Sequence, residues 1–520
     1  MSSKANVWID EDYYKGHGLY FFGQAFLNRC PVRDAEVFEF SQMIFECQVK
    51  PDIDGLFTIV KCFDDKIAVY VSDPGFYPIF YTQSDEGFLI SSVSAKLNFR
   101  GIDSANLAYL KYYGFVPGDK TLYSSVFSIS CGRRCIIEGG AISYEWDRNS
   151  YAVSKDQILN MDRFAIKVGL KSAIDQAFDQ LVVALNGRQA VIPLTAGYDS
   201  RLILTSLLDR KYHNILCFTY GKLGCQEVET ARKVAHIAGV RWVHTDITDD
   251  FISQHNDIDA INSFFSYLSN GRSTVWLCDY FAMKCLQQAN VLDQDAVFIP
   301  GHSGDFLGGS QFIKHIPIDL NYECVVSTYS RLKSVLNRDL FYSSKEYLIY
   351  DAHTFSQKYS RQLIGYSIFE DIDFIEKISK EILNSSKVFE YFGYQVLLPF
   401  FNTQLVDYCK TIPVKYKIGK RLYNDVLIDF CFGKYDLVFE NEMQPSIIDY
   451  RVQNFKNWVK SFFPVEVKNK IVEKNDFLNY KGMVASLVIE LHKNQKRILM
   501  QGSSFNEIMT QYLVDVLFVK

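Results

Sequence analysis

The 520-residue sequence has little proline, a small net charge and no long apolar run. It holds only 12 prolines, and no low-complexity linker interrupts it. Nowhere do about 18 apolar residues follow one another, so we expect no membrane span. The 55 basic and 60 acidic residues give a net charge of −5, which offers no basic field for nucleic acid. We therefore expect neither a nucleic-acid partner nor a membrane-bound protein.

Two further features are absent: a signal peptide and a cysteine cluster. The start of the chain lacks the apolar stretch of a secretory signal. Most of the 12 cysteines lie inside apolar runs, which favours buried free thiols in a reducing compartment. The tight pair Cys131 and Cys135 has no second Cys/His pair at zinc-ligand spacing nearby. We expect a cytoplasmic protein without a structural zinc.

What remains is ordinary for a large globular chain, with 48% hydrophobic and 22% charged residues. The first quarter predicts short strands joined by polar turns. These strands are expected at 56–63 and 66–71, at 78–81 and 87–92, and at 134–138 and 141–146. We place a domain boundary near residue 150, which divides the chain into domains 1–150 and 151–520.

Beyond the boundary, apolar residues at helical spacing predict a long helix over 156–185. Strands and helices then alternate, which is typical of a doubly wound parallel sheet. The strands are expected at 190–194, 214–220 and 241–245, with helices at 201–208 and 226–237. The remainder, from about 320 to 520, predicts helical additions. Its basic face is most simply a solvated surface and comprises Lys456, Lys460, Lys468, Lys470 and Lys474.

The sharpest local feature follows the first of these strands. The strand ends at Leu194, a short loop holds Thr195, Gly197, Asp199 and Ser200, and a helix begins directly afterwards. Ligands of doubly wound sheets bind at such strand ends, and a helix start suits a phosphate. The glycine permits close approach of the backbone and the two hydroxyls add donors. The aspartate would repel a phosphate but suits a hard cation such as Mg²⁺.

A second segment, 299–309, predicts a strand that enters a glycine-rich loop. This loop carries one imidazole and one carboxylate, His302 and Asp305. An ordinary structural turn explains it when it is taken alone. Paired with the loop at 195–200, it favours a functional site. Neither the P-loop motif nor the dinucleotide fingerprint occurs in the chain.

These segments resemble the asparagine synthetase family, a branch of the ATP pyrophosphatases. Residues 195–200 are similar to the family's phosphate loop, Ser-Gly-Gly-x-Asp-Ser. Residues 218–221 and 227–239 look like its second strand and helix, and 299–309 like Ser-Gly-Glu-Gly-[SA]-Asp-Glu-x-x-Gly-Gly. Residues 398–423 are similar to its Pro-Phe-Leu-Asp, Leu-Pro and Lys-x-x-Leu-Arg segments.

The resemblance implies roles for individual residues. It implies that ATP and Mg²⁺ are held by the loop 195–200, with Asp199 and Asp305 as the metal ligands. It places the adenine between Leu194 and Tyr220, and AMP against the backbone of Pro300 and Gly301. It assigns the catalytic lysine to Lys420, with Lys417 as the fallback. The family has Glu where this chain has His302 and again at Phe306, which puts aspartate as the substrate in doubt. His302 is either the base for the amine or a hydrogen-bonded loop histidine.

Residues 50–140 also resemble the family's N-terminal glutaminase domain, which implies an Ntn-hydrolase-like α/β/β/α layer arrangement. The resemblance rests on Asp54-Gly-Leu-Phe57, on 73–81 and on Ser91-Ser92. That domain uses an N-terminal cysteine, whereas Ser2 follows Met1 here, and the family's Arg-Gly and Asn-Gly elements are not evident. An unactivated serine hydroxyl is a weak nucleophile. We interpret this region as a degenerate domain without glutaminase activity.

The sequence therefore predicts an α/β enzyme that forms an amide at the expense of ATP. It would adenylate a small-molecule or peptide carboxylate, release pyrophosphate, and transfer the acyl group to a nitrogen donor. The nitrogen would come from ammonia, a separate glutaminase or an amine. Two alternatives stay open: a glutamine-hydrolysing asparagine synthase, and an inactive scaffold that binds nucleotide or a partner.

Overall fold

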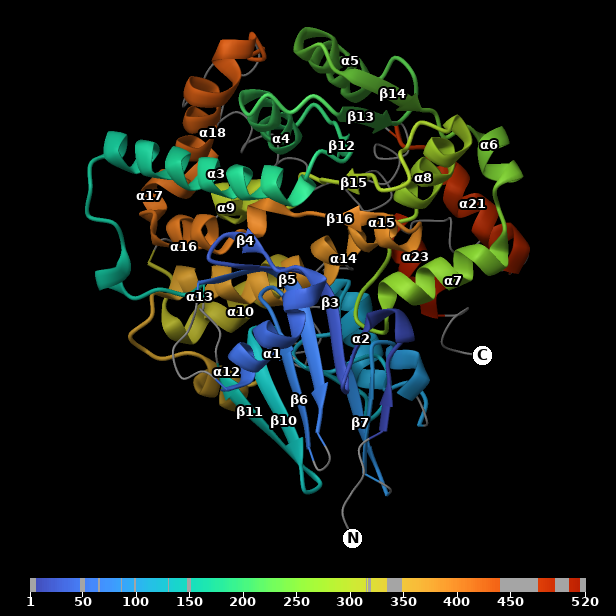
Figure 1. Ribbon diagram of the computed structural model, residues 1–520, viewed down its shortest axis with the longest axis vertical. Helices are drawn as coiled ribbons and strands as arrows, with labels where there is room; N and C mark the ends of the chain where they lie inside the picture. The colour runs from blue at the N-terminus through green and yellow to red at the C-terminus, as the bar shows by residue number, and fades with distance from the viewer. Residues whose placement is uncertain are drawn as a thin grey trace.

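The computed structural model describes residues 6–46, 52–63, 66–85, 87–97, 100–129, 131–146, 151–314, 316, 319–333, 348–439, 476–491 and 505–514. The chain is a mixed α/β protein with antiparallel and parallel sheets. The two N-terminal sheets, which are mainly antiparallel, lie at one end and the five-stranded parallel sheet lies at the other (Figure 1). Ser2 and the basic face at 456–474 lie outside the described residues.

Within the described residues, the N-terminal region forms two sheets. A seven-stranded sheet runs β11-β10-β6-β5-β3-β2, with β4 paired to β3, and a second sheet runs β1-β8-β7-β9. The larger sheet comprises β2 (Tyr14–Gly16), β3 (Leu19–Leu27), β4 (Cys30–Pro31), β5 (Ile53–Cys62), β6 (Lys66–Val71), β10 (Arg133–Glu138) and β11 (Ala141–Trp146). The smaller comprises β1 (Asn6–Trp8), β7 (Phe80–Ser84), β8 (Gly87–Ser91) and β9 (Phe127–Ser128). Each of the three strand pairs expected from the sequence is present as an antiparallel pair.

Alternating apolar residues explain why these strands pack as two layers. Val60 and Val69 face one another across β5 and β6, and both join a buried cluster with Ile79 and Ile90 of the second sheet. The opposite side of the larger sheet carries the phenylalanines of a separate cluster. Helix α1 (Val37–Glu46) covers this side and inserts Phe40 into it. The strand period of two thus gives the larger sheet two buried faces.

The parallel sheet has the order β14-β13-β12-β15-β16 among the described residues. Its strands are β12 (Ala190–Pro193), β13 (Ile215–Tyr220), β14 (Arg241–Thr245), β15 (Val297–Phe298) and β16 (Gln395–Val396). The chain enters at the central strand β12, moves outward through β13 and β14, and then returns to the other side of β12. The order therefore reverses between β12 and β15. In sheets of this kind, ligands bind at the carboxyl ends of the strands at that reversal.

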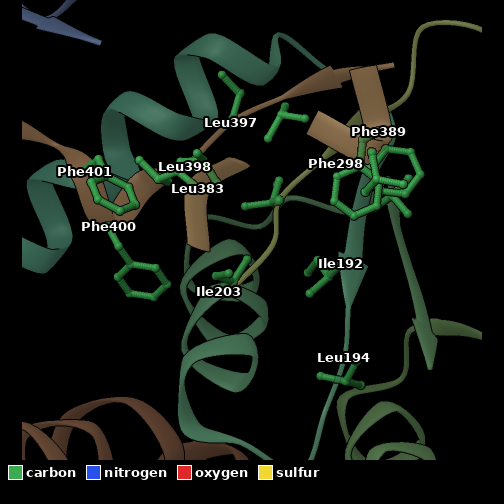
Figure 2. Close-up of a cluster of buried hydrophobic side chains, with 14 of the residues drawn as sticks. Ile192, Leu194, Ile203, Phe298, Leu383, Phe389, Leu397, Leu398, Phe400 and Phe401 are labelled. Atoms are coloured by element: carbon green, nitrogen blue, oxygen red, sulfur yellow. The ribbon is translucent and has the colours of Figure 1, made fainter. Parts of the chain in front are cut away.

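The core of the parallel sheet continues into the N-terminal region. Figure 2 shows Ile192 of β12, and Leu194 just beyond the end of that strand, in a cluster with residues from α4, β15 and α15. The rings of Phe298 and Phe389 stack at 4.2 Å between centroids. The same cluster includes Phe26 and Leu110 from the antiparallel half. The two halves of the chain therefore share one continuous apolar core.

One polar residue of the antiparallel half joins the two halves as well. The carboxylate of Asp54 in β5 accepts hydrogen bonds from the Gln180 side chain at 2.7 Å and from the Asn402 side chain at 2.6 Å. It also accepts from the backbone N–H of Thr403 at 3.0 Å and from its hydroxyl at 2.8 Å. Four donors from the later half of the chain thus converge on one carboxylate.

The long helix expected over 156–185 is wrong at its start. Helix α3 spans Arg163–Leu185, because the Asp162 side chain accepts from the backbone N–H of Ala165 at 2.9 Å and caps it there. The apolar residues Met161, Phe164 and Val168 fit the helical spacing but are 50%, 70% and 47% exposed. A local cap decided the boundary, and periodicity alone could not locate it.

The other expected elements of the parallel half lie within three residues of the prediction. They include the helices α4 (Tyr198–Asp209) and α5 (Gln226–Ala238). Four further helices were not predicted from the sequence: α6 (Asp249–Gln254), α7 (Ile258–Ser269), α8 (Cys278–Ala289) and α9 (Gly304–Gly308). The described part of 320–520 is mainly helical. It contains α10 (Val325–Lys333), α12 (Ala352–Lys358), α13 (Gly365–Ile372), a π-helical stretch (Asp373–Ile382), α14 (Leu383–Ser385), α15 (Lys387–Tyr391), α16 (Thr403–Thr411), α17 (Val414–Lys417), α18 (Arg421–Leu427), α21 (Tyr480–Leu491) and α23 (Phe505–Leu513). Helix α2 (Ser104–Tyr113) belongs to the N-terminal region. Among the described residues, none of these helices has the length and apolar character needed to cross a bilayer.

Candidate functional site

A cavity of about 450 Å³ opens at the carboxyl ends of β12, β13 and β15. It therefore lies at the point where the strand order reverses. Its wall is built from Pro193, Thr195, Gly197, Tyr198, Asp199, Ser200, Tyr220, Asp279, Pro300, Gly301, His302, Asp305, Ser385, Phe389, Lys420 and Asn424. Every site residue expected from the sequence lines this cavity, except Leu194 and the fallback lysine Lys417.

Leu194 lies behind the wall. Its side chain is fully buried in the core, as Figure 2 shows at the end of β12. Its backbone N–H donates to the carbonyl of Phe218 at 2.8 Å, and its own carbonyl accepts from the Thr219 hydroxyl at 2.6 Å. Leu194 fixes where β12 ends, so that Thr195 is the first loop residue to reach the cavity.

The loop after β12 presents the start of helix α4 to the cavity. The Thr195 backbone N–H donates to the Ser200 hydroxyl at 3.1 Å, and the Gly197 N–H donates to the Thr195 hydroxyl at 3.0 Å. Gly197 is the N-cap residue, so no side chain caps the helix at this position. The first N–H groups of a helix point outward and carry a partial positive charge. The loop is therefore shaped to receive an anion.

Arg201 holds this loop from behind and was not anticipated from the sequence. Its side chain is fully buried and donates to the carbonyls of Gly197 at 3.2 Å, Ala196 at 3.0 Å and Leu437 at 2.9 Å. The guanidinium also lies over the ring of Tyr198. By binding the loop's carbonyl oxygens, Arg201 turns them away from the cavity. Its position next to Ser200 is the only signal that the sequence offers for this role.

Two carboxylates meet at the mouth of the loop. Asp199 accepts from the Tyr423 hydroxyl at 2.9 Å through one oxygen and from the Asp305 backbone N–H at 2.8 Å through the other. Burial raises the pKa of Asp199 to about 7, and the negative charge of Asp305 adds to this effect. The Tyr423 hydrogen bond and the positive charge of Lys420 act in the opposite direction. Two adjacent acids in a buried site are stabilised by a cation.

The two carboxylates are compatible with a hard divalent cation such as Mg²⁺. In the described residues, no group of three or more His, Cys, Asp or Glu side chains is arranged to hold a metal. Mg²⁺ commonly uses one or two carboxylates and completes its shell with water and substrate phosphate. Asp199 and Asp305 supply that number, and they lie beside a loop suited to phosphate. The pair therefore fits a cation that arrives together with a phosphate ligand.

The glycines of the second loop are required by close contacts, two of them with the first loop. A Cβ atom on Gly304 would lie 2.6 Å from the Asp199 side chain, and one on Gly301 would lie 3.1 Å from the Ser200 nitrogen. Gly309 has φ of +100°, and its Cβ would lie 2.6 Å from the Lys417 carbonyl. The glycine-rich sequence thus allows the loop after β15 to pack directly on the loop after β12.

The two lysines considered from the sequence occupy different environments. Lys420 lines the cavity and adopts a left-handed backbone conformation with φ of +58°. Lys417 is 2% exposed, and its ammonium forms an ion pair with Glu370 at 3.0 Å. Lys417 also lies over the ring of Tyr151. Only Lys420 is placed to meet a ligand in the cavity.

His302 lines the cavity and is held by one hydrogen bond. Its Nδ1 lies 2.7 Å from the hydroxyl of the buried Ser386. Burial lowers the pKa of His302 to about 4, while the negative charge of Asp305 opposes this shift. The imidazole is therefore neutral near pH 7 and is able to accept a proton.

Several cavity residues escaped the sequence prediction. Tyr198, Asp279, Ser385, Phe389 and Asn424 come from four separate regions of the chain. Tyr198 could have been inferred from its place in the loop at 195–200. The other four carry no local motif, because only the packing of α8, α14, α15 and α18 brings them to the strand ends.

No known protein family and no curated protein matches this chain. Its function is therefore inferred from the geometry and chemistry of the cavity.

Proposed function

We propose that the protein is an ATP-dependent amide-forming ligase of the asparagine synthetase type. The observation that carries this proposal is the convergence of three groups on one cavity: an uncapped helix start, two adjacent carboxylates and a lysine. Together they form a polyphosphate site at the strand-order reversal. The cavity extends past these groups to Tyr220, Phe389 and His302, which leaves room for the rest of a nucleotide and an acyl group.

In the first step, an oxygen of the substrate carboxylate attacks the α-phosphorus of ATP and pyrophosphate leaves. The N–H groups at the start of α4 bind the departing phosphates, and the hydroxyls of Thr195 and Ser200 keep the loop in shape. Asp199 and Asp305 would hold Mg²⁺, which neutralises phosphate charge when it is bound. Lys420 stabilises the negative charge that builds on the pyrophosphate.

In the second step, the nitrogen of the amine attacks the acyl carbon and AMP leaves with the acyl oxygen. The nitrogen must lose a proton, and we assign its acceptance to the neutral imidazole of His302 in the cavity wall. Ser386 orients the imidazole ring through Nδ1. The nitrogen donor is ammonia, the product of a separate glutaminase, or an amine of the substrate.

The same proposal covers the architecture. We assign residues 151–520 to an ATP-pyrophosphatase-type domain, supported by the strand order and the position of the cavity. We assign residues 1–150 to a degenerate Ntn-hydrolase-like domain, supported by its two layered sheets and by α1 on the outer face. The change from antiparallel to parallel strands falls between Trp146 and Ala190. Asp54, which belongs to the resembling motif, binds the later half of the chain.

The test is Mg²⁺-dependent exchange of labelled pyrophosphate into ATP, measured against a panel of carboxylates that includes aspartate, uronic acids and short peptides. Asp199→Asn should abolish the exchange, while the matched control Asp259→Asn, on the exposed side of α7, should retain it. Exchange with aspartate alone, with ammonia as the donor, would favour asparagine synthesis. No exchange together with no ATP binding would overturn the proposal in favour of an inactive scaffold.

A further inference from the structure

Among the described residues that line the cavity, Asp279 is the one carboxylate that the proposed reaction does not use. It lies at the start of α8, and the Tyr220 hydroxyl donates to one of its oxygens at 2.8 Å. Tyr220 itself ends β13, so the pair sits beside the strand next to the phosphate loop. The hydrogen bond fixes the carboxylate against the wall.

The other oxygen of Asp279 has no hydrogen-bond partner among the described residues. Among the described residues of the cavity wall, Lys420 is the only lysine or arginine, and its charge acts on Asp199 instead. Burial raises the pKa of Asp279 to about 6, and only the Tyr220 bond opposes that shift. Near pH 7 the group is therefore mostly ionised and can only accept hydrogen bonds. This partly buried carboxylate lines the cavity, so its second oxygen is available to accept a hydrogen bond from a donor on the ligand.

The surroundings indicate which part of the ligand supplies that donor. The charges of Asp199, Asp305 and Lys420, which define the phosphate end, are not among the groups that shift the pKa of Asp279. Asp279 instead shares the cavity with the aromatic rings of Tyr220 and Phe389. The ring of Phe389 is fixed by its stack on Phe298. Aromatic rings beside an acceptor suit a flat heterocycle with an N–H group on its edge.

We propose that Asp279 selects adenine by accepting a hydrogen bond from its exocyclic amino group. The inference rests on the proposed ATP-dependent function and adds a specificity determinant to it. Adenine carries a donor at this position, whereas guanine carries an acceptor oxygen. That oxygen would face the carboxylate and repel it. A purine without the amino group would leave the carboxylate unpaired.

The experiment compares four Mg²⁺-nucleotides in a direct binding titration: ATP, purine riboside triphosphate, GTP and 2′-deoxy-ATP. Wild-type protein should bind ATP about tenfold or more tightly than purine riboside triphosphate, since a hydrogen bond to a charged group has that strength. Asp279→Ala should bind these two nucleotides equally. Asp279→Asn keeps an acceptor oxygen and should restore part of the preference. Asp259→Ala, on the exposed side of α7, is the matched control and should keep the full preference for ATP over purine riboside triphosphate.

Tyr220→Phe adds a second readout, because it removes the hydroxyl that holds Asp279 and leaves the carboxylate in place. It should weaken the preference for ATP in the wild-type background and have no effect on the ratio in Asp279→Ala. A purely structural role for Asp279 would weaken all four nucleotides by the same factor.

The outcomes separate this inference from the proposed function. If wild-type protein binds ATP and supports exchange but Asp279→Ala keeps the full ATP preference, the inference fails and the function stands. If Asp279→Ala instead loses only the discrimination against 2′-deoxy-ATP, the carboxylate binds the sugar and the inference is wrong. If wild-type protein binds no nucleotide, both are wrong.

Discussion

The ion-paired charges near residues 365–391 and the carboxylates of the cavity are both largely shielded from water, and they differ in how their charges are matched. In the first group, Glu376 pairs with Lys380 at 2.6 Å and Asp373 pairs with Lys333 at 2.6 Å. In the cavity, Asp199 instead adjoins a second acid, and Asp279 has only a tyrosine hydroxyl. A buried charge that forms an ion pair has a structural role, whereas an unpaired charge in a cavity is a candidate for binding a ligand. Two lysines three residues apart illustrate the difference. Lys417 forms a buried ion pair with Glu370, whereas Lys420 lines the cavity.

The largest expected effect comes from breaking a matched pair. Lys417→Met leaves the Glu370 carboxylate buried without its cation, so the free energy of unfolding should fall by about 3–5 kcal/mol. Urea denaturation followed by circular dichroism measures this change. The double variant Glu370→Leu/Lys417→Met removes both charges and should recover most of the loss. A single variant as stable as the wild type would show that this pair is not structural.

The next largest effect is a pH dependence of the free energy of unfolding that is caused by Asp199. Because the folded state raises the pKa of Asp199 from 3.8 to about 7, protonation at this site favours folding. This contribution is complete below pH 4 and is lost as the pH rises to about 7, on the order of 4 kcal/mol in total. Asp199→Asn does not titrate, so the difference in stability between variant and wild type should grow over that range.

Thermal unfolding of both proteins between pH 4 and 8, in buffer with a metal chelator, measures this difference. The two proteins share their other titrating groups, which cancel in the comparison. A constant difference at all pH values would contradict the prediction. Adding Mg²⁺ with pyrophosphate should restore wild-type stability near pH 7 and leave the variant unchanged.

The lysine on the cavity side should affect activity and spare the fold. Lys420→Ala should lower pyrophosphate exchange about hundredfold, because one charge-stabilising group at the reacting phosphates is lost. Its free energy of unfolding should stay within about 0.5 kcal/mol of the wild type, as for a partly exposed side chain. Lys415→Ala, on an exposed side chain nearby, is the control and should retain exchange. Equal exchange in the two variants would remove Lys420 from the mechanism.

The smallest expected effect concerns the proposed role of His302 as the base in amide formation. Ser386→Ala removes the hydroxyl that holds Nδ1 of His302, so amide formation should fall about tenfold, within the range of general-base catalysis. Pyrophosphate exchange reports only the first step and should change less than about twofold on the same grounds. Ser356→Ala, an exposed helix serine, is the control. Equal losses in both reactions would mean that Ser386 supports the cavity as a whole.

The sequence was informative where function depends on consecutive residues. The loops at 195–200 and 299–309 could be placed at strand ends because each follows an apolar strand and contains the glycines that its packing requires. Asp199 and Asp305 come together as a consequence of that topology. The strand pairs of the N-terminal region were equally accessible, since a short polar turn leaves adjacent strands little choice of partner.

The sequence was uninformative where function depends on residues from distant elements. Asp279 lies far along the chain from Tyr220 and has no motif of its own, so only the folded chain reveals their hydrogen bond. The choice between Lys417 and Lys420 depended on Glu370, whose burial cannot be read from its surroundings in the sequence. The start of α3 was misplaced because one capping aspartate outweighed a regular apolar spacing.

The convergence of four donors on Asp54 has a consequence for cooperativity. If the two halves separated, Gln180, Asn402 and Thr403 would lose the Asp54 carboxylate as their hydrogen-bond acceptor. The apolar core that both halves share would also be exposed to water. Neither half can therefore melt far in advance of the other without losing these contacts. The chain should unfold as a single cooperative unit, and a calorimetric scan should show one transition. The N-terminal half would then be a permanent folding partner of the half that carries the cavity.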